Sequence, residues 1–72
     1  LLRRGVATRL LLFALADLAS EGVEEITLEV AVDNAPARAL YERLDFREVG
    51  RRPGYYYRDR ELVDALVMCR TL

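Results

Sequence analysis

The 72-residue sequence contains no histidine and only one cysteine, Cys69. The absence of histidine removes the commonest catalytic base and metal ligand. A single cysteine cannot form a disulfide within the chain, and it fits a reducing compartment, so we expect a cytoplasmic protein. The sequence also lacks a signal peptide and an apolar run long enough to cross a bilayer, so we expect no membrane association.

The composition predicts one small globular domain. Hydrophobic residues make up 53% of the chain and charged residues 32%, which is typical of a folded rather than a disordered protein. A core of this size is marginal and could use a partner surface. The net charge of −1 argues against general nucleic-acid binding. Because the chain starts at Leu1, close to a predicted binding turn, we expect it to be a fragment.

The stretch Arg3–Leu18 begins with a basic turn that contains Gly5 and continues as an apolar helical pattern. The first turn of a helix offers backbone N–H groups without intrahelical partners, at the positive end of the helix dipole. Because Gly5 and Ala7 have little or no side chain, an anion can approach this backbone, and nearby arginines add positive charge. The stretch therefore predicts a phosphate cradle for a pyrophosphate-bearing cofactor. An ordinary helix with a basic first turn is the alternative.

Apolar periodicity predicts a first helix over about Gly5–Glu21, which Gly22 is suited to end. The residues of its predicted apolar face are Val6, Leu10, Leu11, Ala14, Leu15 and Leu18. Strict alternation over Ile26–Val32 then predicts a strand with one apolar face and places Glu29 on the other face. A strand glutamate is usually solvated surface. In a cleft, however, a partly desolvated glutamate can act as a general base.

A second helix is predicted to follow this strand, with Asp33 or Asn34 as its cap and Pro36 in its first turn. The helix should end near Asp45. Tyr41 lies on its apolar face, where a tyrosine is by default a core aromatic. Its hydroxyl still needs a partner, and a buried phenol beside a developing anion can donate a proton.

The remaining chain is predicted to form two further strands. Phe46–Arg52 is the first, Arg51–Gly54 is a turn signal, and Asp64–Leu72 contains the last strand. The tyrosines of Tyr55–Tyr57 could pack in a loop or an interface, or line a peptide-binding groove. Cys69 is expected to be a small core residue, since no histidine is available to activate it.

Several segments together resemble the GCN5-related N-acetyltransferase (GNAT) superfamily. The turn Arg4-Gly5-Val6-Ala7 resembles the end of its Q/R-x-x-G-x-G/A acyl-CoA signature. The segment Leu28–Phe46 resembles its L-E-V-x-x-x-N-x-x-A-x-x-L-Y-x-x-x-G-F pattern. Val49–Arg52, Tyr55-Tyr56 and Asp64–Met68 narrow the resemblance to the RimI group, the ribosomal-protein-alanine N-acetyltransferases. The resemblance covers nearly the whole chain but only the C-terminal half of such an enzyme.

The resemblance implies an α/β fold in the order helix, strand, helix, strand, strand, and acetyl transfer from acetyl-CoA to the terminal amine of a protein or peptide. The residues that it implies for pyrophosphate binding are Arg4, Gly5, Val6, Ala7, Thr8 and Arg9. Asn34 would also contact the cofactor. Glu29 would take a proton from the acceptor's ammonium group, and Tyr41 would protonate the departing thiolate. The region of Tyr55 and Tyr56 would hold the acceptor's N-terminus, and no metal is needed.

The sequence departs from the family pattern in three places. Leu2 stands where the signature has Gln or Arg, and Asp45 replaces a glycine, although Asp tolerates left-handed backbone better than most residues. The stretch Arg60–Asp64 is expected to be a longer link to the last strand than is usual in the family.

Two alternative functions stay open: a small-molecule acetyltransferase, and a non-catalytic module that binds CoA or packs on a partner.

Residues 1–72 are therefore expected to form a partial GNAT domain that lacks the N-terminal strands and helices. In this family a preceding strand splays from the one that corresponds to Ile26–Val32, and the acyl-pantetheine arm lies between them. Without that strand, we expect an unpaired apolar edge. The isolated chain should then self-associate and have no measurable activity.

Overall fold

A computed structural model of the protein describes residues 4–72, so Leu2 and Arg3 of the predicted cofactor signature lie outside the described residues. The elements are α1 (Arg4–Ser20), β1 (Glu25–Ala31), α2 (Ala35–Arg43), β2 (Arg47–Arg58) and β3 (Glu61–Thr71). This order confirms the predicted sequence of helix, strand, helix, strand and strand. Helix α1 and strand β1 each begin and end within one residue of the predicted bounds.

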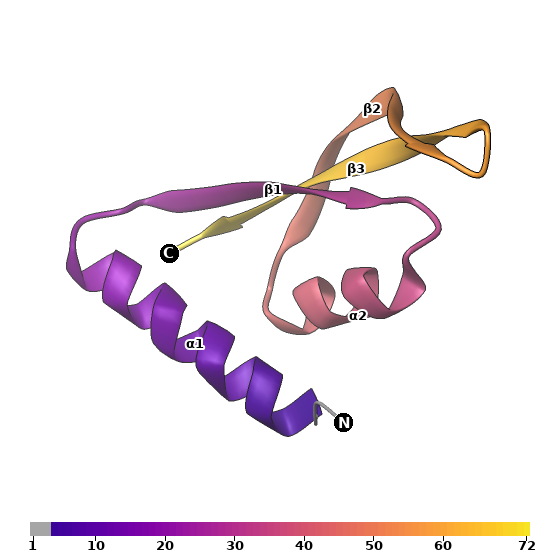
Figure 1. Cartoon of the computed structure of the whole chain (residues 1–72). Coiled ribbons are helices and arrows are strands. Elements are labelled where there is room, and N and C mark those ends of the chain that lie inside the picture. The colour runs from indigo at the N-terminus through magenta and orange to yellow at the C-terminus, as the bar shows by residue number, and fades with distance from the viewer. Residues whose placement is uncertain (1–3) are drawn as a thin grey trace.

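The three strands form one antiparallel sheet in the order β1-β3-β2, so the last strand lies in the middle (Figure 1). Strand β3 pairs with β1 from Glu25↔Thr71 to Ala31↔Ala65, and with β2 from Arg47↔Cys69 to Arg58↔Glu61. Within residues 4–72, β1 therefore has one edge that no strand pairs, as the sequence analysis expected. This free edge positions the candidate site described below.

Both helices lie against the same face of the sheet (Figure 1). One apolar cluster joins the two layers, and its buried members are Leu15, Val30, Leu44, Phe46, Leu66 and Met68. Val30 and Leu66 are directly opposed across β1 and β3, so they share the helix-covered face. The alternating neighbours, including Glu29 and Val67, lie on the other face, which none of the described helices covers.

The predicted apolar face of α1 is broader than the surface that it buries. Leu15 is buried and Leu11 packs against the core, whereas Val6, Leu10 and Ala14 are exposed. Leucines and a phenylalanine surround this helix on several sides, so the described sheet covers only part of its apolar surface. In residues 4–72, neither helix is both long and apolar enough to span a bilayer.

Each helix ends in the same hydrogen-bonded motif, with a left-handed residue just beyond it. Gly22 has φ 91°, its N–H donates to the Ala19 carbonyl, and the next N–H donates to the Leu18 carbonyl. At the end of α2, Asp45 takes the equivalent place with φ 65°, and Phe46 N–H donates to the Tyr41 carbonyl. Gly22 is thus the predicted helix stop, and Asp45 does adopt the left-handed backbone that the family's glycine would adopt.

The prediction of a turn at Arg51–Gly54 is wrong, because these residues lie within β2. The register against β3 shifts between Arg52 and Tyr56, as in a β-bulge. Pro53 has no N–H to donate to a ladder, and the Gly54 N–H donates instead to Oδ1 of Asp64 at 2.9 Å. Gly54 also has φ 59°, so Pro and Gly distort the strand here without reversing it.

The chain reverses later, at Asp59 and Arg60, which have φ values of 52° and 66°. Positive φ at both central residues is the requirement of a two-residue type I′ hairpin turn. The prediction of a long link over Arg60–Asp64 is also wrong, because β3 already begins at Glu61. Arg60 belongs to the turn, and Glu61–Asp64 belong to the strand. The hairpin is therefore tight, and it extends beyond the end of β1.

Candidate active site

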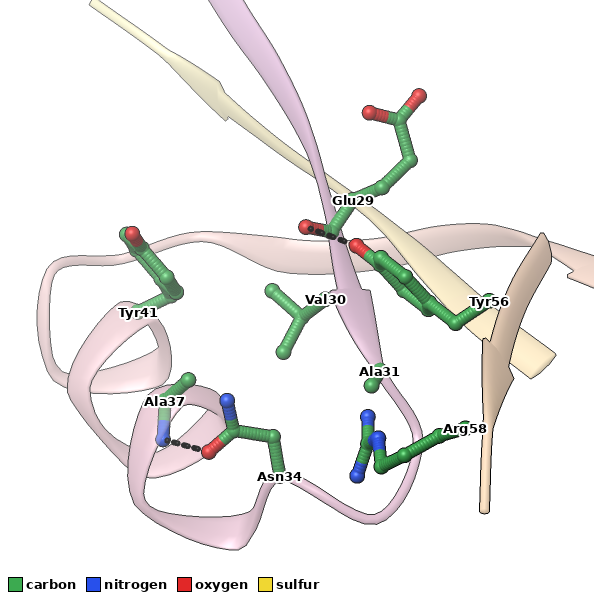
Figure 2. Close-up of a pocket in the computed structure, with 8 residues that line it drawn as sticks. All are labelled: Glu29, Val30, Ala31, Asn34, Ala37, Tyr41, Tyr56 and Arg58. Atoms are coloured by element: carbon green, nitrogen blue, oxygen red, sulfur yellow. Dashed lines mark hydrogen bonds between the residues drawn. The ribbon is translucent and has the colours of Figure 1, made fainter. Parts of the chain in front are cut away.

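A pocket of about 270 Å³ lies beside the C-terminal half of β1 and the start of α2 (Figure 2). The residues that line it are Glu29, Val30, Ala31, Asn34, Ala37, Tyr41, Tyr56 and Arg58. Four of the predicted site residues, Glu29, Asn34, Tyr41 and Tyr56, thus come together from three different elements and one loop. None of the lining residues comes from α1.

Tyr41 projects from α2 toward the pocket while its ring packs against the core (Figure 2). The ring meets Phe46 edge to face, with centroids 5.4 Å apart and an interplanar angle of 70°. Its hydroxyl makes no hydrogen bond to another of the residues that the structure describes. Tyr41 can therefore pack its ring in the core, as predicted, and still present its hydroxyl to the pocket.

Glu29 contributes to the pocket through its backbone, because its side chain points to the opposite side of β1 (Figure 2). The carbonyl oxygen of Glu29 accepts a long hydrogen bond from the Tyr56 hydroxyl, at 3.4 Å. The half-buried carboxylate lies on the open face of the sheet, where its Oε1 is 3.6 Å from Nε of Arg52. The Glu29 carboxylate and the Tyr41 hydroxyl therefore lie on opposite sides of β1, with the carboxylate directed toward Arg52 rather than into the pocket.

The backbone of β1 presents polar groups along this free edge. Val32 N–H donates to the Asp64 carbonyl and Leu72 N–H donates to the Glu24 carbonyl, so the even-numbered residues form the hydrogen-bonded pairs with β3. In an antiparallel ladder the intervening residues then direct their N–H and C=O groups outward. Glu29 and Ala31 are two of these residues, and their carbonyl oxygens accept hydrogen bonds from the Tyr56 hydroxyl and the Asn34 N–H, which leaves their N–H groups to pair outward. An extended chain with amide groups could pair with this edge.

Asn34, rather than Asp33, caps α2: its Oδ1 accepts a hydrogen bond from the Ala37 N–H at 3.2 Å (Figure 2). Capping uses the side-chain oxygen and fixes the Asn34 amide at the pocket. Asp33 instead forms an ion pair with Arg58, whose Nη1 lies 3.0 Å from Oδ2. The structure thus resolves which of the two candidate residues is the cap.

The predicted phosphate-binding residues lie apart from this pocket, in the first turns of α1. Arg4, Gly5 and Val6 belong to the helix itself, where the first N–H groups have no intrahelical acceptor. A Cβ placed on Gly5 would meet no atom within 4 Å, so the backbone there is open to an approaching anion. Gly5, Val6 and Arg9 are exposed, whereas Ala7 and Thr8 are half-buried. This open, N–H-rich turn fits the binding of a phosphate group.

The tyrosines of β2 have different surroundings. Tyr56 lines the pocket, whereas the half-exposed Tyr55 ring lies beside the Arg52 guanidinium, 5.7 Å from centroid to Cζ. Sequence reasoning missed Arg58 as a pocket residue and Arg52 as a partner of Glu29. Arg52 contacts a residue of β1, and Arg58 contacts Asp33 in the loop after it, so the charged residues of β2 were visible in the sequence but their distant partners were not. Within residues 4–72 no group of three or more His, Cys, Asp and Glu side chains could hold a metal ion.

A family model and a relative of known description both match this chain, and both are acetyltransferases. Residues 1–46 match the model of the Acetyltransferase (GNAT) family. The chain is 46% identical over 71 residues to an N-alpha-acetyltransferase of Saccharolobus solfataricus, covering 97% of this chain and 41% of that protein.

Two solved structures share this fold. The ribosomal-protein-S18-alanine N-acetyltransferase from Escherichia coli superposes with a TM-score of 0.86 at 38% identity, over 96% of this chain and 44% of that one. Arabidopsis thaliana NAA60 in complex with acetyl-CoA superposes with a TM-score of 0.84 at 28% identity, over 97% of this chain and 40% of that one. The chain spans less than half the length of each of these relatives.

Proposed function

Because this chain belongs to the GNAT acetyltransferase family, we propose that the protein transfers an acetyl group from acetyl-CoA to the α-amino group of a protein or peptide. One observation carries the proposal: a carboxylate and a phenol lie on opposite sides of β1, the strand with one edge that no described strand pairs. The relatives described as an N-alpha-acetyltransferase and as a ribosomal-protein-S18-alanine N-acetyltransferase support the same reaction. Residues 1–72 are, in this proposal, a partial GNAT domain that supplies these groups.

The first turns of α1 would hold the donor. The open backbone at Gly5 and the exposed Arg9 suit a pyrophosphate, which is doubly stabilised by unpaired N–H groups and the helix dipole. The remaining implied residues, Arg4, Val6, Ala7 and Thr8, belong to the same two turns. Acetyl-CoA supplies an activated acyl group as a thioester. Asn34 would add an amide contact nearer the reacting end, since it is fixed at the pocket by its capping bond.

Glu29 and Tyr41 would divide the proton transfers between them. The acceptor amine must lose a proton before or while it attacks the thioester carbon, and the Glu29 carboxylate would take that proton, directly or through water. The departing sulfur must gain a proton, and the Tyr41 hydroxyl would give it. Their positions on opposite sides of β1 support this division, because the proton lost by the nitrogen and the proton gained by the sulfur are then handled by two separate groups. Orienting the two reactants supplies much of the remaining rate.

For the acceptor, we propose a RimI-like choice: an alanine-terminated protein or peptide in the cytoplasm, with a ribosomal protein as the natural candidate. The likeness to the bacterial ribosomal-protein-S18-alanine enzyme supports this choice. Tyr56 lines the pocket and Tyr55 lies beside it on β2, so both suit contact with an extended peptide.

The experiment uses the natural full-length protein with acetyl-CoA and an alanine-terminated peptide. Mass spectrometry should find one acetyl group on the peptide's α-amine. A matched peptide with a blocked N-terminus and an internal lysine should stay unmodified. Acetylation of small amines with no reaction at the peptide terminus would contradict the proposal and favour a small-molecule acetyltransferase.

A further inference from the structure

An ion pair crosses the open face of the sheet from one outer strand to the other. Nε of Arg52, in β2, lies 3.6 Å from Oε1 of Glu29, in β1, with β3 between the two strands. The Glu29 side chain is 30% exposed and the Arg52 side chain 58% exposed. No other arginine of the described residues forms an ion pair with Glu29.

The strand register explains why Arg52 reaches this carboxylate. Glu29 is opposed to Val67, which is opposed in turn to Gly50 on β2. Gly50 has no side chain to occupy the position in line with Glu29. Arg52 is opposed to Ala65, another small residue, so its long side chain can extend diagonally over β3. A glycine and an alanine thus leave the space that the guanidinium crosses.

Further contacts close a ring around Glu29. The Arg52 guanidinium lies beside the Tyr55 ring, and Tyr55 meets Tyr56 edge to face with centroids 5.0 Å apart. Tyr56 then donates its hydroxyl hydrogen to the backbone oxygen of Glu29 at 3.4 Å (Figure 2). The chain of contacts therefore runs from the Glu29 carboxylate through Arg52, Tyr55 and Tyr56 back to the Glu29 backbone.

We infer that Arg52 is a positioning residue for Glu29 and that Tyr55 and Tyr56 hold Arg52 in place, an inference that rests on the proposed function of Glu29 as general base. A glutamate on an open strand face is free to change rotamer, and tethering one carboxylate oxygen removes much of that freedom. Arg52 contacts Oε1, which leaves Oε2 to accept a proton from the acceptor amine. Exposed ion pairs contribute little to folding stability, so the effect of this pair should be on turnover.

The test compares variants of the natural full-length protein. Arg52→Gln should lower kcat between about threefold and 100-fold, since misplacing a catalytic group has effects of this size. CoA affinity should not change, and Arg52→Lys should restore part of kcat, because lysine keeps the charge but not the planar fork. The matched control is Arg51→Gln: Arg51 lies 3.9 Å from Asp64, opposes Leu66 on the helix-covered face, and should leave kcat unchanged. Thermal unfolding of all three variants checks that they fold.

A double-mutant cycle decides whether Arg52 acts through Glu29. If it does, adding Arg52→Gln to Glu29→Gln should lower kcat no further. A full additional loss, or an unchanged kcat in Arg52→Gln alone while Glu29→Gln is impaired, would overturn the inference and leave the proposed function standing. An unchanged kcat in Glu29→Gln would refute the role of Glu29 itself, and the inference with it.

Discussion

Nη1 of Arg58 lies 3.0 Å from both carboxylate oxygens of Asp33, which ties the β2–β3 hairpin to the loop between β1 and α2. Asp33 precedes the capping residue Asn34, and Arg58 lines the pocket. A second arginine reinforces the same loop, because Nη1 of Arg38 donates to the Val32 carbonyl at 3.1 Å. The loop that forms one wall of the pocket is therefore held by Arg58 of β2 and by Arg38 of α2.

Removing this tether should affect acceptor binding more than stability. Both partners are about half exposed, so we expect Arg58→Gln to lower the free energy of unfolding by less than about 1 kcal/mol. Loosening the hairpin should raise the KM for an alanine-terminated peptide by about three- to tenfold with little change in kcat, the pattern for loss of uniform binding. Steady-state kinetics measure both. Arg60→Gln, at the neighbouring turn, is the control, and an equal effect of both substitutions would contradict this account.

Asp45 stands at the left-handed position after α2, where glycine carries no steric cost. We expect Asp45→Gly to stabilise the protein by up to about 1 kcal/mol and Asp45→Ala to give no such gain, since a Cβ in this conformation is unfavourable. Urea unfolding of the full-length protein measures both. If the alanine variant were as stable as the glycine variant, the left-handed backbone at Asp45 would not be the cause.

Substitution of Gly5 tests the phosphate cradle, because a Cβ added there meets no atom within 4 Å and the residue is exposed. We expect Gly5→Glu to weaken CoA binding by up to about fivefold more than Gly5→Gln, since its negative charge repels the phosphates and offsets the positive end of the helix dipole, which is worth up to about 1 kcal/mol. Calorimetry with CoA measures the affinities. The two side chains have the same size, so equal affinities would mean that the first turn of α1 does not face the phosphates.

The 72-residue chain on its own should self-associate and lack activity. The free edge of β1 can pair with another strand, and α1 exposes Phe13 at 71% and Leu10 at 62%. Size-exclusion chromatography with light scattering should therefore find species larger than a monomer. Phe13→Lys should reduce association, whereas Asp17→Lys, at another exposed position of α1, should do so less. A monomeric chain that consumes acetyl-CoA would contradict this prediction.

Local chemistry predicted the elements of this fold well. Period-two alternation located β1, and Gly22 marked the end of α1, because both signals act within a few residues. The Pro53–Gly54 pair was misread, since the same residues that make a turn can also make a bulge inside a strand. The pairing of Gly54 N–H with Asp64, ten residues later, and the continued pairing of Tyr56–Arg58 with β3 distinguish the two outcomes.

The candidate site was predictable in its members but not in its geometry. The motif that includes Glu29, Asn34 and Tyr41 marked three residues that line one pocket, although Glu29 does so only through its backbone. The partners Arg52 and Arg58 could not be predicted, because their contacts depend on β3 lying between β1 and β2. The exposed side of α1 likewise could not be recognised, since an apolar pattern predicts a buried face without saying what covers it.

The most direct measurement is the turnover of the full-length Tyr41→Phe variant with acetyl-CoA and an alanine-terminated peptide. The substitution removes only the hydroxyl and keeps the ring that packs on Phe46, so the fold and CoA affinity should be preserved. If Tyr41 protonates the departing thiolate, kcat should fall by about 10²–10⁴-fold. A kcat within about threefold of the unsubstituted protein, which is less than about 1 kcal/mol in activation free energy, would contradict the role of this pocket in acetyl transfer.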